Sequence, residues 1–152
     1  MQTIETTIDI DATPEQVWAT LTEFDAYADW NPFITDASET ATEGSRLRIH
    51  IEPPEGRAAT FTPTVTAAVP GERLEWLGKL GVRGLFDGRH EFTLDAIEGE
   101  RTRLVQRERF SGLLVGLLLD EDDISEGFEQ MNATLKERVE AVVSHHDAGV
   151  PA

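Results

Sequence analysis

The sequence predicts an α+β domain: a curved antiparallel sheet of about seven strands wrapped on a long C-terminal helix, with two short helices between the first and second strands. Between residues 33 and 110, short segments of alternating apolar and polar residues follow one another, separated by turn residues. Such alternation is typical of strands with one buried and one exposed face. From residue 124 the apolar residues recur every three or four positions, as on one face of a helix. That helix is the only predicted element long enough to cover the buried face of the sheet.

The composition limits the function. The chain has 152 residues, no cysteine and a formal net charge of −16, from 13 basic and 29 acidic residues. A chain of this length buries a substantial core without disulfides, so we expect a single domain over residues 1–146 and a disordered tail over 147–152. The charge repels nucleic acid and anionic membranes. An acidic excess with scarce lysine resembles the composition of halophile proteins, which predicts a salt-rich environment.

No segment predicts membrane insertion or export. The apolar run 113–119 is far shorter than the roughly 18 residues that a membrane helix needs. The N-terminal residues have neither the basic region nor the apolar core of a signal peptide. We therefore expect a cytoplasmic protein without integral membrane association, as a monomer or homodimer.

The N-terminal part predicts a strand followed by two short helices. Residues 3–10 alternate, with isoleucines on one side. The segment 13–16 combines an N-cap threonine, a proline at the first helical position and a capping-box glutamine. Residues 25–32 form a second short helix or turn, closed by a proline. The apolar face of the first helix comprises Val17, Trp18, Leu21 and Phe24.

Four further strands are predicted before the last hairpin, at residues 33–37, 46–52, 59–69 and 73–79. Pro63 lies inside the third of them. Because proline has no backbone N–H, it implies an edge strand or a bulge at that position.

The last two strands, residues 86–94 and 104–110, place polar side chains on the apolar face of the sheet. Their alternation puts His90, Gln106 and Glu108 on the same side as the buried residues. Opposite charges across the outer face favour one register. With the turn centred on Gly99, that register pairs His90 with Glu108, Phe92 with Gln106, Leu94 with Leu104, Glu91 with Arg107 and Asp95 with Arg103.

The remaining chain is predicted to be helical. Residues 111–119 are apolar, and the acidic run 120–123 interrupts them. Asp123 and Glu126 have the spacing of a new helix cap, and from residue 145 we expect a frayed tail. The apolar face of the long helix comprises Ile124, Phe128, Met131, Leu135, Val139 and Val142.

Five segments carry a family resemblance: Asp11–Trp18, Phe24–Pro32, Pro70–Trp76, Gly88–Phe92 and Glu108–Leu114. They resemble the SRPBCC superfamily, the helix-grip fold shared by START lipid-transfer domains, polyketide cyclases and plant pollen-allergen proteins, and in particular its polyketide cyclase/dehydrase-like branch. The resemblance covers nearly the whole chain. It implies the helix-grip fold, but one fold hosts many unrelated activities.

His90 and Glu108 are the candidate catalytic residues, with Gln106 beside them. If they touch, the carboxylate orients the imidazole, which then serves as a general acid or base. The alternative is a buried pair that satisfies its own hydrogen bonds. Both interpretations stay open at this stage.

A cavity between the sheet and the C-terminal helix, mostly apolar with a few polar anchors, is the usual form of a small-molecule site. Its candidate ligand-binding residues are Trp30, Phe33, Phe61, Trp76, Phe86, His90, Phe92, Gln106, Glu108, Phe110, Leu114, Leu118, Phe128 and Met131.

Motifs for metals and cofactors are missing from the sequence. Four histidines without H-E-x-x-H spacing and without cysteine form no metal constellation, so we expect neither metal nor cofactor. The glycine-rich stretch 79–87, which predicts a flexible or bulged segment, lacks the strand–loop–helix context of a phosphate loop. The acidic run 120–123 is either a solvated helix junction or a cation site.

Three functions follow as hypotheses. The first is binding of a hydrophobic or amphipathic small molecule, lipid- or polyketide-like, in the internal cavity. The second is a cyclase- or dehydratase-type enzyme, a lyase or isomerase, in which His90 is the acid–base group and Glu108 orients it. The third is a protein-interaction role, like that of chaperone-activating relatives.

Overall fold

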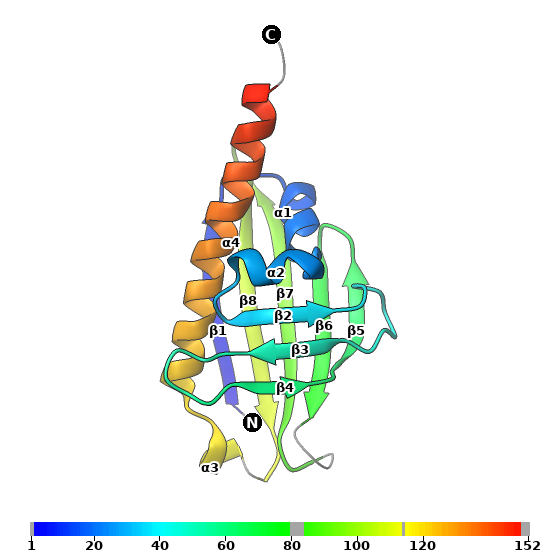
Figure 1. Cartoon of the computed structure of the whole chain (residues 1–152), viewed down its shortest axis with the longest axis vertical. Coiled ribbons are helices and arrows are strands. Elements are labelled where there is room, and N and C mark those ends of the chain that lie inside the picture. The colour runs from blue at the N-terminus through cyan, green and yellow to red at the C-terminus, as the bar shows by residue number, and fades with distance from the viewer. Residues whose placement is uncertain (1, 80–83, 114, 150–152) are drawn as a thin grey trace.

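A computed structural model describes residues 2–79, 84–113 and 115–149, and within them it confirms the α+β prediction (Figure 1). In chain order the elements are β1 (Gln2–Ile10), α1 (Pro14–Leu21), the 3₁₀ helix η1 (Phe24–Ala26), α2 (Tyr27–Trp30), β2 (Ile34–Ser38), β3 (Arg48–Ile51), β4 (Ala59–Phe61), β5 (Thr64–Val69), β6 (Arg73–Lys79), β7 (Asp87–Ile97), β8 (Arg101–Ser111), α3 (Val115–Leu118) and α4 (Glu121–Gly149). Of the predicted glycine-rich segment 79–87, residues 80–83 lie outside the described residues.

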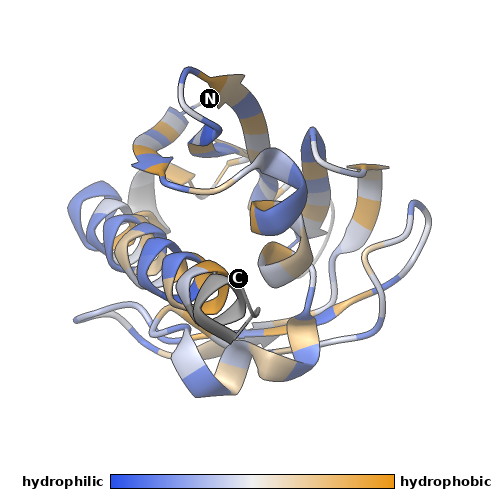
Figure 2. Cartoon of the chain, turned by 90° about the horizontal axis from the view of Figure 1, so that it is seen from above, coloured by the Kyte–Doolittle hydropathy of each residue, from blue (hydrophilic) through white to orange (hydrophobic). Residues whose placement is uncertain are grey.

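The strands form two antiparallel sheets. The larger has the order β1-β8-β7-β6-β5 and the smaller β2-β3-β4. An isolated bridge between Arg46 and Thr64 joins them. In Figure 1 the smaller sheet runs across the larger one, and α4 lies along one side of both. Seen end on in Figure 2, the two sheets and α4 surround a common interior, which side chains fill.

The predicted strand 59–69 is wrong as a single element. It is two strands, and Pro63 stands between them. The Pro63 carbonyl accepts a bond from Leu47 N (2.8 Å), but proline has no N–H with which to continue the ladder. The chain therefore changes sheets at this proline, and β4 and β5 are both edge strands, as the proline indicated.

The predicted register of β7 and β8 is confirmed along its whole length. His90 lies opposite Glu108 and Phe92 opposite Gln106. The turn is centred on Gly99, whose φ of 78° lies in the left-handed region that glycine adopts without strain. On the outer face the Glu91–Arg107 ion pair forms at 2.8 Å. Arg103, in contrast, bonds Asp9 of β1.

The capping box of α1 is confirmed. Thr13 Oγ1 accepts a hydrogen bond from Gln16 N at 3.3 Å, and Gln16 Oε1 accepts one from Thr13 N at 2.9 Å. Val17 and Leu21 are buried, so the helix packs its apolar face on the core.

The cap predicted at Asp123 is wrong, because Asp120, the residue before α4, caps the helix. Asp120 Oδ1 accepts a hydrogen bond from Asp123 N (3.1 Å). The Asp123 carboxylate is occupied elsewhere: it accepts bonds from the backbone N–H groups of Glu55 and Gly56, each at 2.9 Å. Asp123 is only 7% exposed. Its two hydrogen bonds join α4 to the turn between β3 and β4.

The apolar face of α4 is confirmed as far as Val139, after which it differs from the prediction. Val142 is 52% exposed, and Val143 packs against the core in its place. A step of four residues from Val139 keeps the side chain on the same face at 3.6 residues per turn. The helix continues to Gly149, so its backbone includes residues 147–149 of the tail that the sequence predicts to be disordered over 147–152.

Candidate functional site

Three polar side chains meet on the inner face of β7 and β8. His90 is 4% exposed, and its Nδ1 lies 3.1 Å from Glu108 Oε1. Its Nε2 lies 2.9 Å from Gln106 Oε1. The inward orientation of His90 and its contact with Glu108 are the geometry that the alternation of the two strands predicted.

The hydrogen bonds continue beyond the hairpin into α4 and β1. Gln106 Nε2 donates to Asn132 Oδ1 at 2.7 Å and, at 3.4 Å, to the Phe128 carbonyl. Asn132 Nδ2 donates to Thr6 Oγ1 (2.8 Å), and Thr6 Oγ1 donates to the Gln106 carbonyl (3.4 Å). Thr6, Gln106 and Asn132 are all buried. We call Glu108, His90, Gln106, Asn132 and Thr6 the polar chain.

Aromatic rings surround the imidazole of His90. Trp76 stacks on it with a centroid distance of 5.1 Å and an interplanar angle of 26°. Phe92 and Phe128 lie at 4.8 and 5.0 Å. A polar group is tolerated in such surroundings only when its hydrogen bonds are made, and the polar chain makes them.

Those predicted ligand-binding residues whose side chains the structure describes lie in the interior or pack against it. Phe33 contacts Phe128 near the imidazole, with centroids 5.5 Å apart. Phe86 contacts Phe110 at the open end of the hairpin, with centroids 5.7 Å apart. Buried among the predicted set are Phe33, Trp76, His90, Phe92, Gln106, Phe110, Phe128 and Met131, and partly buried are Trp30, Phe61, Phe86 and Glu108. Leu114 lies outside the described residues, and only the backbone of Leu118 is described.

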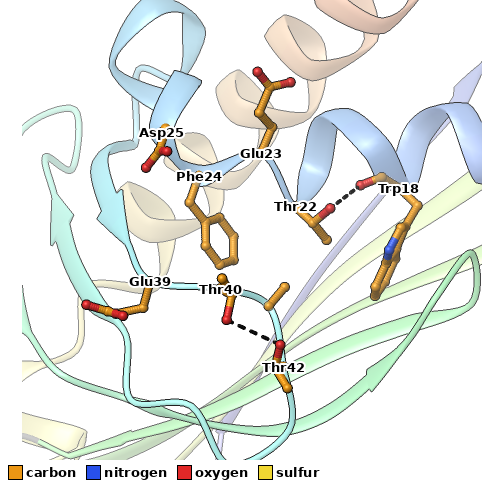
Figure 3. A pocket seen from close by; sticks show the side chains of 9 residues that line it. Trp18, Thr22, Glu23, Phe24, Asp25, Glu39, Thr40 and Thr42 are labelled. Atoms are coloured by element: carbon orange, nitrogen blue, oxygen red, sulfur yellow. Dashed lines mark hydrogen bonds between the residues drawn. The ribbon is translucent and has the colours of Figure 1, made fainter.

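A hollow that sequence reasoning missed opens beside these residues. It has a volume of about 290 Å³ and lies between the end of α1, η1 and the turn after β2 (Figure 3). The Phe24 ring lies in its wall and also packs edge-on against Trp76, at a centroid distance of 6.4 Å. Its lining residues are Trp18, Thr22, Glu23, Phe24, Asp25, Glu39, Thr40, Ala41 and Thr42. The turn 39–42 has no periodic pattern, so only Trp18 and Phe24 gave any sequence signal.

The outer face of the larger sheet carries charge. Glu75 and Glu91, both buried, accept bonds from arginines on neighbouring strands. Burial alone raises the pKa of the Glu75 carboxyl, but hydrogen bonds from Arg89, Thr66 and Arg73 outweigh it and hold that pKa below the ordinary 4.5. The ion pairs of this face include Arg73–Glu75, Arg73–Glu91, Arg89–Glu75, Arg107–Glu91, Arg107–Glu5 and Arg103–Asp9.

The described residues contain neither a metal-binding cluster nor a helix suited to span a membrane. No group of three or more histidine, aspartate or glutamate side chains there is arranged to hold a metal ion. Of the helices in the same part of the chain, none combines the length and apolar character needed to cross a membrane.

Comparison with known proteins identifies the family. Residues 1–143 match the family described as polyketide cyclase/dehydrase and lipid transport. The chain belongs to this family. Membership implies a small hydrophobic ligand, without specifying it. No curated protein matches the chain.

Solved structures share the fold at low sequence identity. A START superfamily protein from Mycobacterium smegmatis is 20% identical with a TM-score of 0.73, over 92% of this chain and 98% of that one. A Rhodobacter sphaeroides protein is 22% identical with a TM-score of 0.74, over 92% and 93%. A Thermus thermophilus protein is 20% identical with a TM-score of 0.73, over 93% and 99%. At these identities the likeness shows the helix-grip fold alone.

Proposed function

We propose that this protein binds a hydrophobic or amphipathic small molecule, lipid- or polyketide-like, between the larger sheet and α4. The observation that carries the proposal is the polar chain set among aromatic rings on the inner face of the sheet. A mostly apolar lining with a few fixed polar groups is the common form of a ligand site. The family, which includes lipid transport and polyketide cyclisation, supports the same conclusion.

The ligand enters, in this proposal, through the hollow at the end of α1. Phe24 lines the hollow and contacts Trp76, and Trp76 stacks on His90. Movement of the Phe24 ring therefore opens a route from the hollow to the imidazole. The aromatic side chains along this route are packed on one another, so they shift to admit a ligand.

Native mass spectrometry of the purified protein tests the binding function. The expected result is a co-purified lipid-like molecule, or a mass shift when an apolar naphthalene probe is added. Absence of both outcomes would refute binding.

Filling the hollow tests the entrance. Ala41→Trp places an indole among the lining residues, whereas Ala133→Trp places the same group on the exposed surface of α4. We expect Ala41→Trp to slow association of the probe by about tenfold or more, and Ala133→Trp to leave it unchanged, because entry limits the association rate when a route must open. Stopped-flow fluorescence measures both. Equal rates for the two variants would place the entrance elsewhere.

A second candidate function is catalysis of the cyclase or dehydratase kind. The specific observation is the contact between His90 Nδ1 and Glu108 Oε1 at 3.1 Å, a distance suited to proton transfer within the pair. Once a substrate is identified, turnover that survives in both His90→Ala and Glu108→Gln would exclude this pair from the chemistry.

A further inference from the structure

We infer that Glu108, and not His90, is the polar group that a bound ligand contacts, and that its Oε2 atom selects ligands carrying a hydrogen-bond donor such as a hydroxyl or phenol. The inference rests on the proposed binding function. It reverses the roles that the sequence suggested, in which the carboxylate only orients the imidazole.

His90 has no nitrogen left for a ligand. Nδ1 bonds Glu108 and Nε2 bonds Gln106, and the aromatic side chains of Trp76 and Phe128 pack against the ring. Its side chain is 5% exposed. A ligand could reach either nitrogen only by breaking a bond of the polar chain, so His90 is a positioning residue.

Glu108 is the accessible end of the polar chain. Its side chain is 17% exposed, and only Oε1 is bonded to His90. Oε2 lies over Gly88, where a Cβ atom would collide with it. Among the described residues no hydrogen bond reaches Oε2. The absence of a side chain at Gly88 thus leaves room for this carboxylate oxygen beside β7.

The directions of the hydrogen bonds assign the protons. The Phe128 carbonyl can only accept, so the atom of Gln106 facing it is Nε2, and Gln106 Oε1 is an acceptor. The proton between Gln106 Oε1 and His90 Nε2 therefore sits on Nε2. The Nδ1–Oε1 contact then needs one further proton, held either as imidazolium with carboxylate or as neutral imidazole with carboxylic acid. In both forms Oε2 of Glu108 is a hydrogen-bond acceptor.

The surroundings of Oε2 define the rest of the ligand. Ile4 of β1 lies opposite Glu108 and is buried. Phe110 of β8 lies opposite Gly88 of β7 and contacts the Phe86 ring. An acceptor oxygen with apolar neighbours suits a hydrophobic ring or chain that carries one donor. The same surroundings do not suit an anionic ligand, because its acceptor oxygen would face Oε2, a second acceptor, with no donor between them.

A matched pair of probes tests the inference: a naphthol, and its methyl ether, which keeps the ring but lacks the donor. We expect the wild-type protein to bind the naphthol about tenfold more tightly, the effect of one net hydrogen bond. Glu108→Gln should keep this preference, because its amide N–H₂ can donate to Nδ1 while its carbonyl takes the place of Oε2. Glu108→Leu removes the acceptor and should bind both probes equally. Calorimetric titration measures the affinities, and circular dichroism melts verify the folding of each variant.

The outcomes separate the two proposals. Binding of neither probe to a wild-type protein that carries no co-purified ligand refutes the proposed function, and the role of Glu108 falls with it. Equal binding of both probes by the wild type, or a preference that persists in Glu108→Leu, refutes only the role of Glu108. Long-range ¹H–¹⁵N NMR of histidine in the unliganded protein adds a check that needs no variant: Nε2 of His90 should carry a proton, and an unprotonated Nε2 would overturn the assignment.

Discussion

At the scale of the residue, His90 is tolerated in the core because every polar atom of its ring is bonded. Its ring lies among Trp76, Phe92 and Phe128, in surroundings where an unbonded nitrogen would be costly. The two bonds to Gln106 and Glu108 remove this cost. The same bonds connect β7 to β8 and, through Gln106, to α4.

Replacing His90 by alanine is therefore expected to destabilise the protein. His90→Ala leaves Gln106 Oε1 and Glu108 without their partner, and stranded buried polar groups cost about 1–3 kcal/mol. His50→Ala is the matched control: His50, on β3, is only partly buried and bonds the Thr60 hydroxyl near the surface, so its loss should change stability by about 0.5 kcal/mol or less. Urea unfolding measures both variants. A His90→Ala variant as stable as the wild type would show that the polar chain does not stabilise the fold.

At the scale of the element, Asp123 joins the first turn of α4 to the turn between β3 and β4. Its two carboxylate oxygens accept bonds from successive backbone N–H groups, those of Glu55 and Gly56. Gly56 also has no room for a side chain, because a Cβ there would lie 2.7 Å from Asp123 Oδ2. The acidic run 120–123 is thus a helix junction with one buried carboxylate, and this contact attaches the smaller sheet to the helix.

Removing this carboxylate should loosen the smaller sheet. Asp123→Ala loses two bonds to a charged acceptor and is expected to cost about 2–4 kcal/mol. Asp122→Ala removes an exposed neighbour of the same charge and should cost about 1 kcal/mol or less, through the helix dipole alone. Hydrogen exchange should show the loss of protection at the amides of residues 55 and 56 in Asp123→Ala alone. Similar exchange in both variants would mean that the contact is not formed in solution.

At the scale of the whole molecule, the net charge is −16, and acids on the outer face of the larger sheet are paired with arginines. Hydrogen bonds from Arg107 and Arg103 hold the pKa values of Glu5 and Asp9 below their ordinary ranges. Glu75 is bonded by two arginines and is buried, unlike those exposed pairs. The salt-rich environment, which the acidic composition predicts, stays a prediction.

The Glu75 carboxylate should make stability depend on pH. Because its pKa is lower in the folded state, its contribution is fully present above the unfolded value and is lost as pH falls through the folded value. At about pH 7, Glu75→Gln should cost about 1–2 kcal/mol. Below about pH 4.5 the difference in unfolding free energy between variant and wild type should shrink, because the wild-type carboxyl becomes protonated and both side chains are then uncharged. Urea unfolding across this range measures it, and a difference independent of pH would contradict the ion-pair role.

The sequence by itself determined what depends on neighbouring residues along the chain. Alternation within two adjacent strands and the charges across them were enough to predict the β7–β8 register, and with it the contact between His90 and Glu108. The capping box of α1 is local in the same way. The family resemblance extended this to the helix-grip fold.

Only the tertiary structure decided which distant residues meet. Thr6 and Asn132, 126 positions apart, complete the polar chain, and no local pattern pairs them. The engagement of Asp123 with residues 55 and 56 and the hollow beside Phe24 have the same origin. The roles of His90 and Glu108 depend on which atoms the packing leaves accessible. Periodicity assigns a side chain to a face of its element, whereas burial and hydrogen bonding at each atom are set by every element packed against that face.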